Sequence, residues 1–157
     1  MNRITISNLK FENVEEANNF VLKYNIILFQ DDDDVIICYQ SSSENIRDGW
    51  KSIVEDLAYY FQSNLIDSIV SRNLLLVFCA NEDDDIDINT KKEIQSNTYC
   101  CRKLARSNVS NLEGTIKDLI FFDTTVQRIS NTSSLSFLIK ERYPEIFKLL
   151  SLKDEAK

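Results

Sequence analysis

The stretch LLLVFCA, residues 74–80, decides the fold because it is an unbroken apolar run in the middle of the chain. A strand with this composition is buried on both faces, as in a parallel or mixed sheet. The run is far too short for a membrane-spanning helix, which needs about 18 apolar residues or more. Residues 74–80 therefore predict a central strand, and the segments on either side should supply its neighbours.

The segments before this run predict a helix followed by a β-hairpin. Residues 13–25 place apolar side chains at helical spacing, with Asn13 as the expected N-cap. Two short apolar runs follow, residues 26–29 and 35–39, separated by the acidic residues 31–34. This arrangement predicts two antiparallel strands joined by an acidic turn.

A long amphipathic helix is expected to begin at Ser41. Ser41 and Glu44 have the S-x-x-E spacing of a capping box, in which each side chain bonds the other residue's backbone N–H. The residues that follow form an apolar stripe about five turns long, which should face a core. The stripe consists of Ile46, Trp50, Ile53, Val54, Leu57, Phe61 and Leu65.

The segments after the central run continue the alternation of strands and helices. An acidic loop at 81–87 precedes a predicted helix at 89–96 and a predicted strand at 98–105. Two further helices are expected at 111–122 and 134–152, the second interrupted near Pro144. The pattern predicts an α/β fold of the mixed (α+β) kind. We expect a small mixed sheet with an N-terminal hairpin, flanking helices and a helical C-terminus.

Length and composition favour one intracellular domain. The chain has 157 residues, and we expect a single α/β domain over residues 1–152 with a frayed tail at 153–157. The net charge of −7 argues against a primary role in holding nucleic acid. The four cysteines and the absence of a signal-peptide pattern predict a reduced, cytoplasmic protein without a membrane segment.

Several residue types that catalysis and cofactor binding require are missing. The sequence has no histidine, which excludes a Ser–His or Cys–His nucleophile pair within the chain. Neither of its two glycines lies in a nucleotide-binding motif, and no C-x-x-C pair occurs. The spacing of Asp83, Asp85 and Asp87 resembles a calcium loop, but Ile88 and Ile94 occupy the required Gly and Glu positions. We therefore expect no catalytic residue, metal or cofactor.

Two alternatives remain open at this level. A magnesium-dependent nuclease would combine Glu55 or Asp56 with Asp83 and Lys103, although Cys101 stands where an acidic residue should precede the lysine. An acidic protein that neutralises a basic toxin would instead use the Asp clusters at 31–34 and 83–85.

Candidate partner-binding residues fall in two segments. The segment NTYCCRKLARS, residues 97–107, concentrates Arg102, Lys103 and Arg106 in an otherwise acidic chain. It is typical of an edge strand protected by charges, or of a docking strand for an acidic or phosphate-bearing partner. Tyr59 and Tyr60 precede a third aromatic residue in the long helix, so at least one ring should be displayed for an interface.

The order of these features resembles the middle components of bacterial ABC-three-component systems, including the small subunit of Lamassu-type anti-phage defence complexes. The resemblance spans residues 45–125 and includes Trp50, the run at 74–80 and the Cys-Arg-Lys motif of residues 101–103. It implies a bridging or regulatory subunit without catalysis of its own. The implied partners are an SMC-like or ABC-type ATPase and an effector nuclease, with DNA reached only through the complex.

Overall fold

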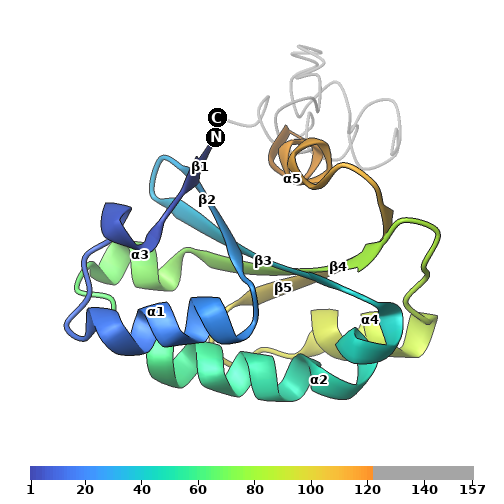
Figure 1. Ribbon diagram of the computed structural model, residues 1–157, viewed down its shortest axis with the longest axis horizontal. Coiled ribbons are helices and arrows are strands. Elements are labelled where there is room, and N and C mark those ends of the chain that lie inside the picture. The colour runs from blue at the N-terminus through green and yellow to red at the C-terminus, as the bar shows by residue number, and fades with distance from the viewer. Residues whose placement is uncertain (122–157) are drawn as a thin grey trace, which may run out of the picture. The chain divides into compact units, whose positions relative to one another are not determined.

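The computed structural model describes residues 1–121 and contains a five-stranded mixed sheet (Figure 1). Residues Met1–Lys117 form one compact unit. The spatial order of the strands follows the sequence, β1-β2-β3-β4-β5. Their bounds are β1 Asn2–Ile4, β2 Ile27–Asp31, β3 Asp34–Ser41, β4 Leu74–Asn81 and β5 Arg102–Val109. The predicted α/β fold with a mixed sheet is confirmed.

The connections between the strands explain why one half of the sheet is antiparallel and the other half is parallel. Strands β1, β2 and β3 are antiparallel neighbours, and a two-residue turn at Asp32 and Asp33 joins β2 to β3. Strand β4 lies between β3 and β5 and is parallel to both, because a helical segment precedes each return to the sheet. The predicted hairpin and the predicted central strand are both confirmed.

The helices are short except for one continuous segment. Helix α2, Ser43–Asp56, runs directly into a π-helical turn, η2, at Leu57–Gln62. The remaining helices are η1 Ile6–Asn8, α1 Val14–Lys23, α3 Ser68–Arg72, α4 Ile88–Ser96 and α5 Leu112–Phe121. Helices α1 and α2 lie along the same face of the sheet, and α4 packs beside β5 (Figure 1).

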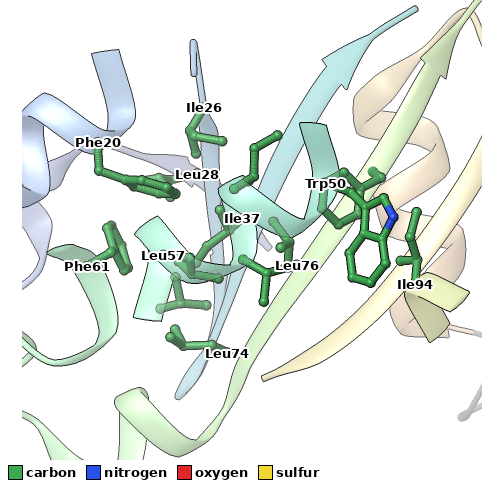
Figure 2. Close-up of a cluster of buried hydrophobic side chains, with 14 of the residues drawn as sticks. Phe20, Ile26, Leu28, Ile37, Trp50, Leu57, Phe61, Leu74, Leu76 and Ile94 are labelled. Carbon is green, nitrogen blue, oxygen red and sulfur yellow. The ribbon is translucent and has the colours of Figure 1, made fainter. Parts of the chain in front are cut away.

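The main core lies between this helical layer and the sheet (Figure 2). The entire predicted stripe of the long helix, from Ile46 to Leu65, is buried there. Leu28, Ile37 and Leu76 meet it from the sheet. Removal of apolar area from water contributes about 25 cal/mol per Å², so burying these side chains stabilises the fold.

The start of α2 differs from the prediction by one residue. Ser42 is the N-cap, and its Oγ accepts a hydrogen bond from the Asn45 backbone N–H at 3.3 Å. Ser41 is the last residue of β3, and its Oγ accepts from the Asn45 side chain instead. The predicted Ser41–Glu44 capping box is therefore wrong, because the strand extends through Ser41 and delays the helix.

Replacing Ser42 by alanine should lower the free energy of unfolding by about 1 kcal/mol, the usual effect of losing an N-cap. The physical cause is the loss of the acceptor for the Asn45 N–H at the exposed start of the helix. Urea denaturation measures the change. Ser41→Ala is the matched control and should change stability less, and a larger loss at Ser41 would contradict the assigned cap.

Strand β5 also begins later than predicted. The sequence predicts a strand over 98–105, whereas the observed strand starts at Arg102. Cys100 has a φ of 62°, a left-handed conformation that an extended strand cannot contain. Cys100 and Cys101 thus lie in the turn before the strand. The predicted helix at 134–152 and the tail at 153–157 lie outside the described residues.

Candidate functional site

Lys103 is a buried cation that holds the turn before β5 together. Its side chain is only 4% exposed, and its ammonium donates hydrogen bonds to the carbonyl oxygens of Asn97, Tyr99 and Cys101. The bond to Asn97 measures 3.1 Å and that to Cys101 2.7 Å. The expectation that Lys103 contacts a partner is corrected here, because all three donors of the ammonium point into its own chain.

Arg102 and Arg106 have a different environment. Both belong to β5, the last strand in the sheet order, so within residues 1–121 this strand pairs only with β4. Arg102 is exposed and Arg106 is half-buried. Arg106 is four positions after Arg102, which places them on the same face of the strand about 13 Å apart along its axis. The two arginines thus make one edge of the sheet basic.

Three tyrosines gather near the beginning of this strand. Tyr59 and Tyr60 lie on η2, with ring centroids 5.0 Å apart and edge-to-face geometry. Tyr59 and Tyr99 line the same surface hollow, together with Glu16 and Asn64. The exposed fractions are 69% for Tyr59, 38% for Tyr60 and 56% for Tyr99. We call Tyr59, Tyr60 and Tyr99 the tyrosine patch.

The π-helical turn brings the tyrosine patch and β5 to the same end of the sheet. Gln62, at the end of η2, donates from Nε2 to the carbonyl of Cys100 at 3.2 Å and to that of Ser71 at 2.8 Å. These bonds connect the tyrosine-bearing turn to the segment that enters β5. π-Helical turns occur frequently at functional sites. Tyr99 was missed by the sequence reasoning, although it lies within the segment that was singled out.

The residues of the nuclease alternative are not brought together. Lys103 is paired in register with Leu76 near the start of β4, whereas Asp83 follows the far end of that strand. Five residues of strand separate these levels, or about 16 Å. Asp56 accepts hydrogen bonds from Lys23 and Tyr24, both at 2.7 Å. Within residues 1–121 no three acidic or thiol side chains are arranged to hold a metal ion.

The acidic loop after β4 is tied to the rest of the domain. Asp84 accepts from the Ser43 backbone N–H at 2.6 Å, and Asp85 pairs with Lys91 at 2.8 Å. Asp87 caps α4 by accepting from the N–H groups of Asn89 and Thr90. In the other cluster, Asp31 pairs with the N-terminal amine at 2.7 Å. Asp31, Asp84 and Asp85 therefore already have partners within the described part of the domain.

Acid should destabilise the domain partly through Asp84. Hydrogen bonds from the Ser43 hydroxyl and then from its backbone N–H lower the pKa of Asp84. A carboxyl group with a folded pKa below its unfolded value of about 3.9 contributes stability above that pH. The contribution disappears as the pH falls through the folded pKa.

An Asp84→Asn variant should therefore lose stability at neutral pH and show a shallower decline in stability between neutral pH and the acid range. Denaturation midpoints measured across that range test this expectation. Asp83→Asn is the matched control, since Asp83 is exposed on the same loop. An identical acid response in Asp84→Asn and the unmodified chain would contradict the role assigned to Asp84.

Comparison with known proteins adds no family to this description. No family model matches the chain, and neither the curated proteins nor the solved structures contain a significant relative. None of the helices within residues 1–121 has the length and apolar character needed to cross a membrane. The fold and the site define the class as a mixed α/β domain with a patch of tyrosines near the start of its last strand, and with two arginines on the face of that strand opposite the helices.

Proposed function

We propose that this chain is a non-catalytic, protein-binding subunit of a larger assembly. The observation that supports the proposal most directly is the position of the tyrosine patch beside the start of the basic edge strand β5. The tyrosines and the backbone edge of β5, which the sequence places about 40 residues apart, thereby lie at the same end of the sheet, while Arg102 and Arg106 project from the sheet face opposite the helices.

The chemistry of the surface suits a protein partner. An edge strand offers backbone N–H and C=O groups that an extended segment of another chain can pair with. Arg102 and Arg106 would favour acidic side chains along that segment. Exposed tyrosines contribute large, rigid contact areas with a polar end, which makes them common interface anchors. A partner with an acidic, partly apolar segment fits this combination.

The resemblance to ABC-three-component middle components suggests which partners to test first. We propose an SMC-like or ABC-type ATPase as the protein that docks on β5, and an effector nuclease as a further subunit. In this arrangement the chain bridges or regulates the other subunits in the cytoplasm of a bacterium defending itself against phage. DNA would be reached only through the assembled complex.

Co-purification tests the proposal. The tagged chain is expressed together with its genomic neighbours, and the recovered material is examined by native mass spectrometry. We expect a stoichiometric complex that contains a large coiled-coil ATPase. Recovery of the chain by itself would contradict the subunit proposal, and a nuclease assay with and without Mg²⁺ would then become the next measurement.

Variants locate the interface within that experiment. An Arg102→Glu/Arg106→Glu double variant should weaken the complex at least about tenfold, because reversed charges oppose the acidic segment. Tyr59→Ala should weaken it by a similar factor through the loss of an anchor. Arg47→Glu is the matched control, because Arg47 is an exposed arginine on α2 with only surface ion pairs. Equal weakening by all three variants would exclude β5 as the docking strand.

A further inference from the structure

Three adjacent surface hollows lie around α1, η2 and the turn before β5. The middle one has a volume of about 400 Å³, and we call it the tyrosine hollow. It shares Glu16 with the hollow on one side and Tyr99 with the hollow on the other side. Its lining residues are Glu16, Ala58, Tyr59, Ser63, Asn64 and Tyr99. This lining therefore contains a carboxylate and two tyrosine rings but no lysine or arginine.

Both neighbouring hollows have a lysine of this chain beside an aromatic ring and a carboxylate. At the first, the Lys23 ammonium lies 4.8 Å from the centroid of the Tyr24 ring and 2.7 Å from an Asp56 carboxylate oxygen. At the second, the Lys51 ammonium lies 5.5 Å from the centroid of the Trp50 ring, and a glutamate of α2 lines the same hollow. An aromatic ring attracts a cation through its quadrupole, and a carboxylate adds the opposite charge. The surface thus uses the same combination on both sides of the tyrosine hollow.

The tyrosine hollow offers the ring and the carboxylate without the cation. Tyr59 and Tyr99 are both more than half exposed, so their rings are open to a partner. The five ion pairs among residues 1–121 do not include Glu16. Asn64 holds the Glu16 carboxylate by donating from Nδ2 to its Oε2 at 3.1 Å, and donates to the Tyr60 carbonyl at 2.9 Å. Glu16 lies in the first turn of α1, where the helix dipole stabilises a negative charge.

We propose that the tyrosine hollow binds a lysine side chain of a protein partner. The ammonium contacts the rings of Tyr59 and Tyr99 and donates a hydrogen bond to the Glu16 carboxylate. It thereby completes the combination that the chain makes for itself at the neighbouring hollows. The net charge of −7 favours the approach of a basic group. The partner is the protein expected under the proposed function, on which this inference rests, and its lysine adds a basic contact beside the acidic segment that pairs with β5.

Nuclear magnetic resonance tests the site on the full chain without any partner protein. The probe is glycyl-lysyl-glycine with both ends capped, added to the isotope-labelled chain. Backbone amide signals of residues 58–64 and of Tyr99 should shift in a saturable way. The capped tripeptide with norleucine in place of lysine keeps the apolar stem but has no charge, so it should bind at least about fivefold more weakly. Salt at about 1 M should also weaken binding of the lysine peptide, because salt screens exposed charges.

Variants of the hollow locate the binding. Glu16→Gln should weaken binding of the lysine peptide at least about fivefold, because it removes the charge but keeps an acceptor for Asn64. Glu15→Gln is the matched control, since Glu15 is exposed on the same turn of α1 and does not line the hollow. Tyr99→Leu should weaken binding through loss of the ring, whereas Tyr99→Phe should retain it. Equal weakening by both glutamine variants, or by both Tyr99 variants, would overturn the site.

Carbodiimide cross-linking of the co-purified complex tests the partner. The reagent joins a carboxylate directly to a lysine amine that contacts it, and Glu16 falls in the tryptic peptide of residues 11–23. We expect an amide bond between Glu16 and a partner lysine, and its loss in Glu16→Gln. Cross-links that involve only other carboxylates would overturn the lysine site, as would a lysine peptide that binds no better than its norleucine counterpart. Both results leave the subunit proposal standing, whereas recovery of the chain by itself contradicts the subunit proposal, whatever the peptide titration shows.

Discussion

Phe61→Ala should lower the free energy of unfolding by about 3–5 kcal/mol, the cost of removing a buried phenylalanine side chain. Phe61 has no exposed surface and lies on η2 (Figure 2). Its ring packs edge-on against Phe11 with centroids 5.0 Å apart, and lies 5.9 Å from the Phe20 ring. Domains are stable by only about 5–15 kcal/mol, so this loss should be visible as a large shift in the urea midpoint.

Tyr59→Ala provides the matched control for Phe61. The two aromatic residues are on the same π-helical turn, but Tyr59 is 69% exposed. Exposed substitutions usually change stability by less than about 0.5 kcal/mol. A loss at Tyr59 comparable to that at Phe61 would contradict the assignment of Tyr59 to the surface and of Phe61 to the core.

Lys103→Met should lower the free energy of unfolding by about 3 kcal/mol. Methionine keeps much of the apolar stem but removes the ammonium that bonds the carbonyls of Asn97, Tyr99 and Cys101. Three partly buried carbonyls would lose their donor, and we expect this cost to exceed what is regained by no longer burying the charge. Chemical denaturation measures the total, and faster amide exchange over residues 97–101 should locate it.

Lys91→Met is the control for the second prediction. The Lys91 ammonium bonds the Asp85 carboxylate, whose side chain is 70% exposed, so little stability should be lost. Lys103→Arg is a stricter test, because it keeps the positive charge. The planar guanidinium cannot direct its donors at three converging carbonyls as the ammonium does. If Lys103→Met is as stable as Lys91→Met, the ammonium does not hold the turn.

The sequence predicts most of the fold because apolar patterns report which side chains are buried. The run at 74–80 contains no polar residue, so only a central strand can accommodate it. The two runs around Asp32 and Asp33 are too close together for anything except a hairpin. The stripe from Ile46 to Leu65 identifies the core face of α2 and η2 correctly. Each of these features depends on burial alone.

The site was less predictable because it depends on backbone hydrogen bonding. A stripe of apolar residues does not distinguish the π-helical turn at Leu57–Gln62 from a regular helix, since both bury Phe61. The burial of Lys103 depends on carbonyl directions in the preceding turn. One signal was present: Lys103 shares its strand face with the buried Ala105, whereas Arg102 and Arg106 lie on the other face.

The chain forms its left-handed turns without glycine. Positive φ angles occur at Asn25, Asp32, Asp83, Cys100 and Asn108, and neither glycine of the chain has one. Asn and Asp tolerate this conformation because a short polar side chain can bond the nearby backbone. Cysteine has no comparable group. The thiol at residue 100 therefore occupies a position that backbone preference by itself would give to asparagine or glycine.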